Sequence, residues 1–264
     1  MPSGSDVTRL LAALAAFFPA LVLAQSCARP VYLTFDTGHM GVAPLVADVL
    51  SRNNVKVTFF AANEKTREGD GSLGKHWAGW WRARAAEGHE FASHTWNHTY
   101  WRADLPGEPQ RFRVRPSSGP DAFVDRSWTG AEYCAEIEQA ARRLEELTGR
   151  KPLPLFRAPG GKTSPQLLKT AQACGYRHVG WSPSGFLGDE LPSETASNDQ
   201  LLKKALREVR TGDILVAHLG IWSRKDPWAP AVLEPLIVGL KARGFCFATL
   251  REHPAYRDWI SRVK

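Results

Sequence analysis

From residue 31 onward, short runs rich in β-branched and aromatic residues alternate with longer stretches whose apolar residues recur at helical spacing. The pattern predicts strands at 31–35, 55–60, 91–92, 154–156, 177–181, 213–217 and 245–250. It predicts helices at 43–52, 77–86, 131–147, after Pro165, at 199–209 and at 231–242, and a long loop over 100–128, which is rich in Pro, Gly and Arg. Such alternation is typical of a parallel sheet covered by helices, either an α/β barrel or a doubly wound fold, here in a single domain.

The first residues follow a different pattern. Arg9 precedes an apolar run over 10–24 that is too short to span a bilayer and is interrupted by Pro19. Ala24 then offers a small-residue cleavage site before Gln25. We interpret residues 1–24 as a signal peptide and 25–264 as the catalytic domain of a secreted or periplasmic protein. The alternative is a segment that is retained as a membrane anchor.

Export predicts that the four cysteines form disulfides, because an oxidising compartment lets them pair. The predicted helices that hold Cys134 and Cys174 are consecutive along the fold, whereas Cys27 precedes the first strand and Cys246 lies in the last. Among the three possible pairings we therefore favour 134–174 and 27–246. Four reduced cysteines in the core are the alternative.

Composition limits the classes of partner. The chain has 264 residues, 43% of them hydrophobic, which is enough for one large core, and a formal net charge of +7. Arg111, Arg113 and Arg115 concentrate positive charge within the predicted loop. A basic secreted protein suits an anionic polymer such as peptidoglycan or an acidic exopolysaccharide better than nucleic acid. A solvated surface without a partner is the alternative.

Candidate chemistry gathers at the ends of predicted strands. His94 and His98 are four residues apart directly after one strand, so both imidazoles can reach one ion, and neutral imidazole is a good zinc ligand. Asp36, Arg157 and His218 each follow another strand. In barrels the carboxyl ends of the strands form the functional face, which predicts that these side chains meet there. The alternatives are a helix-capping role for Asp36, an ordinary ion pair for Arg157 and a core position for His218.

Four segments carry a family resemblance. Residues 34–38 (T-F-D-T-G) are similar to the motif T-F-D-D-G, residues 94–98 (H-T-W-N-H) match H-[ST]-x-x-H, residues 157–161 (R-A-P-G-G) resemble R-x-P-x-G, and residues 215–218 (L-V-A-H) loosely match a strand that closes in L-x-H. With these motifs in order over residues 30–250, the chain resembles the polysaccharide deacetylases of carbohydrate esterase family four, which include chitin and peptidoglycan deacetylases.

The resemblance implies a distorted (β/α) barrel of about seven parallel strands and hydrolysis of an N-acetyl group on a glycan by metal-activated water. It implies that His94 and His98 bind a divalent ion, zinc first and cobalt or nickel as alternatives. Asp36 would be the general base, His218 the general acid that protonates the leaving amine, and Arg157 the partner that keeps Asp36 ionised. This chemistry is also what amide hydrolysis requires, namely an activated water, a stabilised oxyanion and an acid on the amine side.

The chain departs from the family pattern at three places. Thr37 stands where a second aspartate is the third metal ligand, so Thr37 is a doubtful third ligand and affinity for the ion should fall. Gly160 stands where an aromatic residue often lines the groove, although its backbone N–H can still serve the oxyanion. The aspartate that orients the acid histidine is missing after Trp181, and Asp189 is a candidate replacement.

Substrate contacts are expected from aromatic residues near strand ends, because indole faces stack on sugar rings. Trp101, Trp181 and Trp222 are the candidates, together with Gly160. We expect a monomer that acts on an N-acetylated polysaccharide, without nucleic acid and without a membrane span in its mature form. Two alternatives stay open: a catalytically silent glycan-binding module whose site decayed at Thr37, and an amidohydrolase or esterase that acts on a non-sugar substrate.

Overall fold

The computed structural model describes residues 27–263, so the predicted signal peptide lies outside the described residues. Seven strands are parallel, at the positions that the hydrophobic pattern predicts: β1 (Pro30–Asp36), β2 (Thr58–Ala61), β3 (Glu90–Ser93), β7 (Leu155–Phe156), β8 (Arg177–His178), β9 (Ile214–His218) and β10 (Cys246–Phe247). The helices are α1 (Ala43–Arg52), α2 (Ala78–Ala86), α3 (Gly130–Thr148), α4 (Pro165–Ala173), α5 (Asn198–Glu208), α6 (Leu233–Ala242) and α7 (Arg257–Arg262), with a short 3-10 turn, η1 (Pro159–Gly161). Of these helices, α7 was not expected from the sequence.

The sheet curls into a distorted barrel around β1. The strand order is β10-β1-β2-β3-β7-β8, and β9 also pairs with β1, from Tyr32 opposite Ile214 to Asp36 opposite His218. Residues 182–187, which follow β8, run beside β9: Ser182 N–H donates to Ile214 O at 3.0 Å and Val216 N–H donates to Gly185 O at 2.9 Å. This irregular segment connects the β8 side of the sheet to β9, and the predicted barrel of about seven parallel strands is confirmed.

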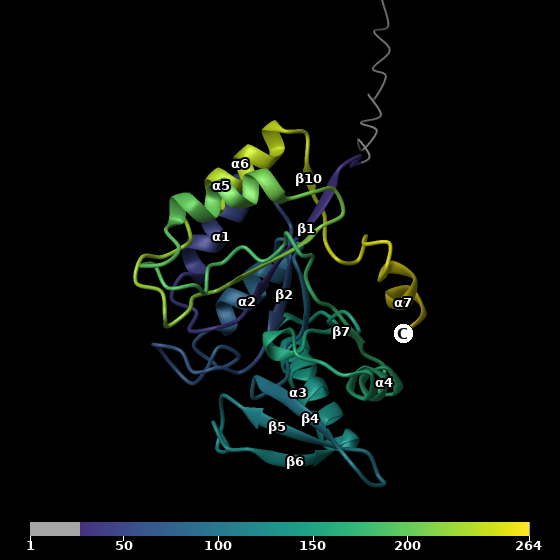
Figure 1. Ribbon diagram of the computed structural model, residues 1–264. Coiled ribbons are helices and arrows are strands. Elements are labelled where there is room, and N and C mark those ends of the chain that lie inside the picture. Colours follow the sequence, from purple (N-terminus) through teal and green to yellow (C-terminus); the bar gives the residue numbers. More distant parts are fainter. Residues whose placement is uncertain (1–26, 264) are drawn as a thin grey trace, which may run out of the picture.

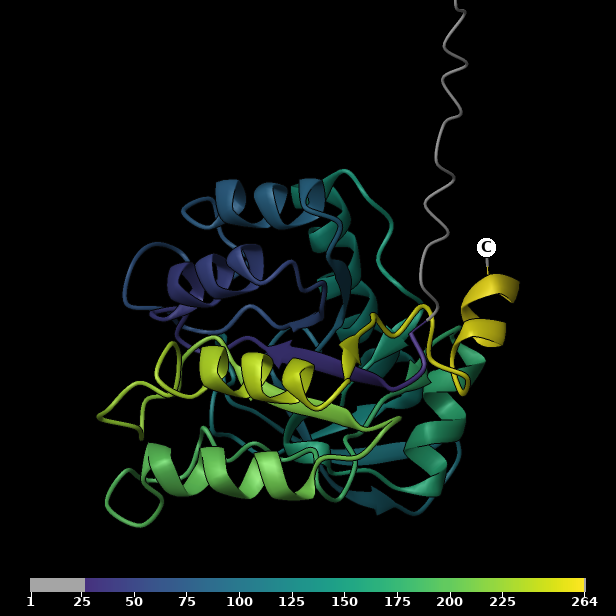
Figure 2. The same ribbon diagram turned by 90° about the horizontal axis from the view of Figure 1, so that it is seen from above.

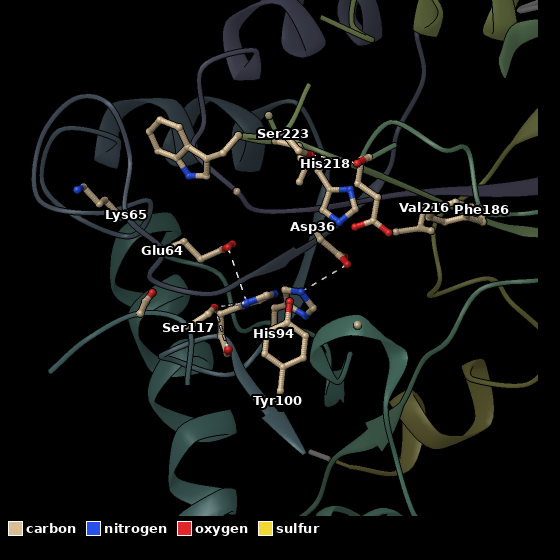
Figure 3. A pocket seen from close by; sticks show the side chains of 18 of the residues that line it. Asp36, Glu64, Lys65, His94, Tyr100, Ser117, Phe186, Val216, His218 and Ser223 are labelled. Atoms are coloured by element: carbon tan, nitrogen blue, oxygen red, sulfur yellow. Dashed lines mark hydrogen bonds and ion pairs between the residues drawn. The ribbon is translucent and has the colours of Figure 1, made fainter. Parts of the chain in front are cut away.

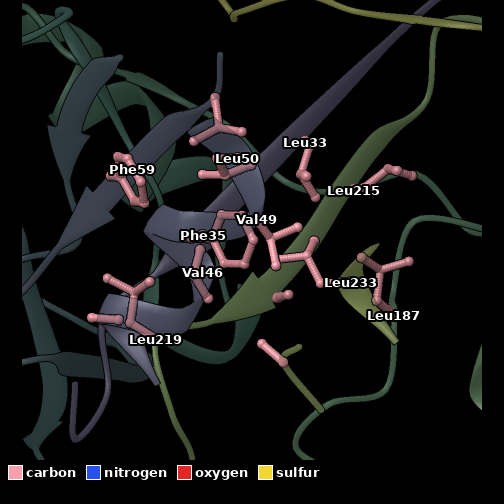
Figure 4. Packing of buried hydrophobic residues seen from close by; sticks show 14 of the residues in the cluster. Leu33, Phe35, Val46, Val49, Leu50, Phe59, Leu187, Leu215, Leu219 and Leu233 are labelled. Atoms are coloured by element: carbon pink, nitrogen blue, oxygen red, sulfur yellow. The ribbon is translucent and has the colours of Figure 1, made fainter. Parts of the chain in front are cut away.

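Helices cover the outside of the barrel (Figures 1 and 2). Helix α6 packs against both α1 and α5, and α3 packs against both α2 and α4. Figure 4 shows the core beneath α1 and α6, where Phe35 of β1 meets Val46 and Val49 of α1 and Leu233 of α6. Each such buried aliphatic or aromatic side chain contributes roughly 1.5–3 kcal/mol relative to an exposed one.

The two-residue period of the strands decides which side chains face the barrel interior. In β1, Val31, Leu33 and Phe35 belong to the cluster under the helices, whereas Tyr32 belongs to a second cluster with interior residues such as Phe60. Because successive side chains point to opposite faces, Asp36 falls on the same face as Tyr32, at the carboxyl end of the strand. The inward face thus ends in a carboxylate at the barrel mouth.

The prediction of a loop over 100–128 was wrong. This stretch forms a three-stranded antiparallel sheet, β4 (Thr99–Leu105), β5 (Arg111–Pro116) and β6 (Arg126–Thr129), which lies apart from the barrel strands (Figure 1). In β5 the arginines alternate with Phe112 and Val114, which are fully buried in a cluster with Tyr133 and Ile137 of α3. An amphipathic strand is therefore present, but its two apolar residues are outnumbered by charges and its packing partner comes later in the chain.

The helix expected after Pro165 and the predicted cysteine pairing are both present. Ser164 caps α4 by accepting a hydrogen bond from Leu167 N–H, with Pro165 at the first helical position. Disulfides join Cys27 to Cys246 and Cys134 to Cys174, with Cα–Cα distances of 5.9 and 6.3 Å. Among the described residues, no helix combines the length and the apolar character needed to cross a bilayer.

Candidate active site

A pocket of about 450 Å³ opens at the carboxyl ends of the barrel strands (Figure 3). Most of the predicted site residues line it, namely Asp36, His94, His98, Gly160, Trp181, His218 and Trp222. Arg157 lies fully buried against Asp36, whereas Thr37 and Trp101 do not line the pocket. Trp101 instead packs against the cluster beneath the small sheet and donates its indole N–H to Asp104 Oδ1 at 3.0 Å.

Asp36 and Arg157 form a buried ion pair. Arg157 Nη1 donates to Asp36 Oδ1 at 2.6 Å, and its other nitrogens donate to the carbonyls of Val179 at 3.2 Å and Gly180 at 3.3 Å. The guanidinium also lies 4.2 Å from the ring centre of Phe60. Burial by itself raises the pKa of Asp36, but the charge and hydrogen bond of Arg157, together with the charges of His94 and His218, outweigh burial and lower that pKa below its ordinary value. Asp36 is therefore a carboxylate near neutral pH.

His94 and His98 are held by a strained turn after β3. Thr95 and His98 adopt φ values of 64° and 49°, a left-handed conformation that costs residues other than glycine about 1–3 kcal/mol. Glu136 of α3 stabilises the turn: its carboxylate accepts from Asn97 N–H at 2.8 Å and from Asn97 Nδ2 at 2.7 Å. The role of Glu136 was not expected from the sequence. The sequence offered one indication of this role, because Glu136 is a charged residue on the apolar face of an amphipathic helix, beside Tyr133.

The hydrogen bonds of the two imidazoles define their tautomers. His94 Nδ1 lies 2.9 Å from Arg157 O, and because a carbonyl only accepts, Nδ1 carries the proton. His98 Nδ1 lies 2.6 Å from Ser117 Oγ, whose own hydroxyl donates to His98 O at 3.2 Å, so His98 Nδ1–H is again the donor. Burial lowers the pKa of His94 to about 4. A neutral His94 therefore presents a bare Nε2 lone pair, and the Nδ1–H of His98 likewise leaves its Nε2 free.

His94 and His98 offer the kind of donor set that a divalent metal requires. Two imidazoles whose Nδ1–H is bound elsewhere and whose Nε2 is free are the usual form of histidine ligands, and their ring centres lie 4.8 Å apart. His94 Nε2 also lies 3.5 Å from Asp36 Oδ2, so two buried acceptors face each other, an arrangement that a cation or a proton donor between them satisfies. The residues therefore fit an ion that takes two histidine nitrogens.

A third protein ligand for the ion is poorly defined, in contrast to the two histidines. Within residues 27–263, no group of three or more His, Cys, Asp and Glu side chains is close enough to hold a metal ion. Thr37 Oγ1 already accepts a hydrogen bond from Ala62 N–H at 3.0 Å, and Thr37 N–H donates to Phe60 O at 3.0 Å. Glu64, which the sequence analysis did not single out, lines the pocket with Oε1 at 3.9 Å from His98 Nδ1.

His218 occupies another wall of the pocket, at the end of β9, and pairs with Asp189. Its backbone N–H donates to Asp189 Oδ2 at 2.6 Å, and its Nδ1 lies 3.1 Å from Asp189 Oδ1. Burial by itself lowers the pKa of His218, but the charge and hydrogen bond of Asp189, with the charge of Asp36, outweigh burial and raise that pKa to about 9. Asp189, the candidate for the place of the missing aspartate, thus contacts His218, and His218 is an imidazolium at neutral pH.

The space beside Gly160 is filled by an aromatic ring from another segment. Gly160 has a φ of 63°, and a Cβ there would lie 2.9 Å from Tyr100 Cε1. Tyr100 of β4 lines the pocket and also contacts His98 edge-on, with ring centres 5.0 Å apart. The aromatic wall that Gly160 lacks is thus contributed by the small sheet, which sequence analysis took for a loop.

One pocket at the barrel mouth holds a pair of histidines that fits a metal ion, a buried carboxylate and a charged histidine. This combination is typical of a hydrolytic site in a protein of the α/β barrel class. Residues 24–179 match the family model "Polysaccharide deacetylase". The chain belongs to the polysaccharide deacetylase family, which places it among hydrolases that act on carbon–nitrogen bonds other than peptide bonds.

Individual relatives agree with this assignment. The chain is 28% identical to a chitooligosaccharide deacetylase of Azorhizobium caulinodans, over 83% of this chain and 92% of the relative. It is 25% identical to a peptidoglycan-N-acetylglucosamine deacetylase of Bacillus cereus, over 86% of this chain and 89% of the relative. A family 4 acetyl xylan esterase from Clostridium thermocellum, solved in complex with a cobalt ion, has the same fold, with a TM-score of 0.64, 23% identity, and coverage of 87% and 92% of the two chains.

Proposed function

We propose that this protein is an exported, metal-dependent hydrolase that removes N-acetyl groups from a glycan. The observation that carries the proposal is that one pocket holds proton acceptors on one wall and a proton donor on another. Asp36 and His94 present acceptors 3.5 Å apart on one wall, while His218, with a pKa raised to about 9, presents a proton on another. Amide hydrolysis needs both, because the attacking water must lose a proton and the leaving amine must gain one.

Each residue has a role that follows from its contacts. Asp36, held ionised by Arg157, accepts the proton of the attacking water through its free Oδ2. His218, charged and oriented by Asp189, donates its proton to the amine nitrogen as the carbon–nitrogen bond breaks. Gly160 lines the pocket, and its backbone N–H would stabilise the developing oxyanion. Arg157 is a positioning residue, since its nitrogens bind Asp36 and backbone carbonyls rather than facing the pocket.

His94 and His98 would hold the ion through their Nε2 atoms, as their tautomers allow. Bound zinc, or cobalt or nickel in its place, lowers the pKa of a coordinated water to about 7 and polarises the acetyl carbonyl. The assignment of Thr37 as third ligand stays a prediction: its hydroxyl keeps one lone pair beyond the bond from Ala62. A neutral ligand there predicts weaker retention of the ion than an aspartate would give.

The substrate class follows from the relatives and from the charge. The relatives named above act on chito-oligosaccharides and on peptidoglycan, both of which carry N-acetylated sugars. A net charge of +7 favours an anionic polymer, so peptidoglycan comes first, followed by a chitin-like polymer or an acidic exopolysaccharide. The proposed compartment is outside the cytoplasm, which also agrees with the two disulfides. We propose that the chain acts there as a monomer.

The test is acetate release from peptidoglycan fragments and chitin oligomers, with mass spectrometry to detect the loss of one acetyl group per event. Treatment with a chelator should abolish release, and addition of Zn²⁺ or Co²⁺ should restore it. Arg157→Lys is a useful companion variant, because it keeps the charge and loses the planar contacts to Asp36 and the backbone. Activity that ignores both the chelator and the added metal contradicts the proposed mechanism.

A second candidate function is a catalytically silent glycan-binding module. The poorly defined third metal ligand favours it. The described residues offer no cluster of three His, Cys, Asp or Glu ligands, and the Thr37 hydroxyl is engaged by Ala62. Such a module binds oligosaccharide without acetate release at any metal concentration, and Asp36→Asn changes only its affinity. Thr37→Asp distinguishes the two readings, because in an active enzyme the added carboxylate raises zinc affinity and lowers the metal concentration needed for activity.

A further inference from the structure

Asp189, which pairs with His218, is carried by a loop. Residues 187–197, the Asp189 loop, contain no helix or strand and end where α5 begins. The carboxylate binds His218 from this loop: Oδ2 accepts from the backbone N–H, and Nδ1 lies 3.1 Å from Oδ1 and 3.2 Å from Oδ2. Within residues 27–263, the carboxylate makes no hydrogen bond to its own loop. Its position therefore depends on what holds the loop.

Arg224 reaches into the Asp189 loop from the loop that follows β9. Its side chain is 3% exposed, and its Nε donates to Asp226 O at 2.9 Å within its own loop. The two terminal nitrogens cross to the Asp189 loop and to the first residue of α5, where they donate to Leu191 O at 2.8 Å, Ala196 O at 3.1 Å and Asn198 Oδ1 at 2.6 Å. One guanidinium thus holds the Asp189 loop two residues after Asp189 and again at its end.

The charge of Arg224 makes this contact hard to break. The carboxylate of Asp226 lies 3.5 Å from Nη2 and is 50% exposed, so the guanidinium is satisfied mainly by its four hydrogen bonds to carbonyl and amide oxygens. A buried charge is costly unless hydrogen bonds satisfy it. Separation of the two loops would remove three of these four acceptors. The guanidinium therefore favours one arrangement of the Asp189 loop beside β9.

We infer that Arg224 is a positioning residue, which holds the Asp189 loop so that the Asp189 carboxylate stays bound to His218. The proposal rests on the proposed function for the role of His218 as the acid, and it adds the residue that keeps the acid and its partner together. Ser223 contributes a further contact between the two loops, since its hydroxyl donates to Glu190 O at 3.1 Å. An aspartate carried by a loop, instead of directly following Trp181, requires such support.

The other charges around His218 make the inference testable by the sign of an effect. Burial lowers the pKa of His218, and the charges of Asp189, Asp36 and Glu190 raise it. A second cavity of about 190 Å³ is lined by His218 and by several charged or titratable residues, namely His39, Arg67, Asp189, Arg224 and Lys225. Across this cavity, the positive charge of Arg224 by itself disfavours a protonated His218. Loss of that charge alone would raise the pKa of His218, whereas loss of the Asp189 contact would lower it.

The test is the pH–rate profile of acetate release for the wild-type chain, Arg224→Met and Arg224→Lys. Arg224→Met should move the basic limb to lower pH by about one unit, so that kcat/KM above the limb falls about tenfold. Arg224→Lys, which keeps the charge and loses the planar guanidinium, should move the limb in the same direction by a smaller amount. Added to Asp189→Asn, Arg224→Met should cause no further shift, because no carboxylate is left to position.

Lys225→Ala is the matched control. Lys225 Nζ lies 2.7 Å from Glu194 Oε1, so this ion pair joins the same two loops, but both side chains are exposed and such pairs contribute little. The basic limb of Lys225→Ala should stay in place. Circular dichroism and thermal unfolding show whether each variant is folded, and Arg224→Lys decides by the same criterion if Arg224→Met does not fold.

An unmoved basic limb in a folded Arg224 variant, or a shift to higher pH, overturns the inference. So does a further shift when Arg224→Met is added to Asp189→Asn. The failure of the proposed function is a separate outcome, since an NMR titration of the His218 ring, assigned with His218→Gln, needs no substrate. If the wild-type chain releases no acetate, the pKa of His218 should still be lower in Arg224→Met than in the wild type, and an unchanged pKa contradicts the positioning role.

Discussion

Two walls of the pocket hold histidines in different charge states, one neutral and one protonated. His94, after β3, has a pKa lowered to about 4, whereas His218, at the end of β9, has a pKa raised to about 9. Burial lowers the pKa of both, so burial does not explain the difference. The partners do: His94 donates to a backbone carbonyl, and the carboxylate that it faces, Asp36, is already paired with Arg157, whereas His218 binds the carboxylate of Asp189 directly. A neutral acceptor leaves the imidazole neutral, and a buried charge holds it protonated.

Under the proposed function, one residue type would serve as metal ligand on one wall and as acid on the other. Pairs of titratable groups whose surroundings push their pKa values apart indicate the assignment of acid and base. Here the carbonyl of Arg157 and the hydroxyl of Ser117 define the ligand wall, and Asp189 defines the acid wall. Variants of these partners therefore separate the two roles.

The largest effect is expected from Asp36→Asn, which removes the proton acceptor that faces His94. General-base catalysis contributes about 10²–10⁴-fold, so kcat for acetate release should fall by that factor. The variant also leaves Arg157 buried without its charged partner, which costs about 3–5 kcal/mol in the free energy of unfolding. Circular dichroism and denaturant unfolding show whether the variant is folded. A folded variant with activity within tenfold of the wild type excludes Asp36 as the base.

Asp189→Asn should weaken the acid wall alone. His218 is protonated below its pKa of about 9, so the acid is present at neutral pH and is lost as the pH rises through that value. Without the carboxylate the pKa falls toward its ordinary range near 6.5, and the basic limb of the pH–rate profile moves to lower pH by roughly two units. The stability from protonated His218, complete below about 6.5 and lost through about 9, should also disappear. An unshifted basic limb contradicts this role.

Ser117→Ala should weaken the ligand wall alone. It removes the hydroxyl that accepts from His98 Nδ1, and loss of such an outer-shell partner costs about 10–100-fold in metal affinity. Zinc content after dialysis should fall, activity should return at high zinc, and the basic limb of the pH–rate profile should stay in place. Ser118→Ala is the control, since the Ser118 hydroxyl donates to Asn63 O instead. Unchanged zinc affinity in Ser117→Ala removes Ser117 from the site.

The smallest effect is expected from Glu136→Gln, which loosens the turn that carries both ligand histidines. The amide side chain can still accept from Asn97, but the charge-assisted bonds become neutral ones, worth about 1 kcal/mol less. Stability should fall by that amount and zinc affinity severalfold, with no change in the basic limb. A loss confined to stability shows that Glu136 supports the fold rather than the ligand wall.

Much of the barrel was predictable because the signals are local. Period-two alternation places Asp36 on the inward face of β1, and helical spacing marks α1 and α3. The family motifs named Asp36, His94, His98 and His218, all of which line the pocket. The pairing of Cys27 with Cys246 and of Cys134 with Cys174 followed from the predicted order of elements.

The small sheet was not predicted because its apolar residues are buried only by a helix that lies further along the chain. Phe112 and Val114 alternate with arginines in a stretch rich in Pro and Gly, and they are buried by Tyr133 and Ile137 of α3. The filling of the space at Gly160 by Tyr100 has the same origin. Local periodicity in the sequence cannot predict a contact between residues of two distant segments.

The sequence by itself determined which ionisable residues reach the barrel mouth, since alternation along each strand and the order of elements decide that. The protonation state of these residues was decided only by the tertiary structure. Asp36 meets a guanidinium 121 residues away, and His218 meets a carboxylate 29 residues away in a loop of irregular backbone. A pKa is set by burial and by neighbouring charges within a few ångströms, and in this chain those neighbours come from other parts of the sequence.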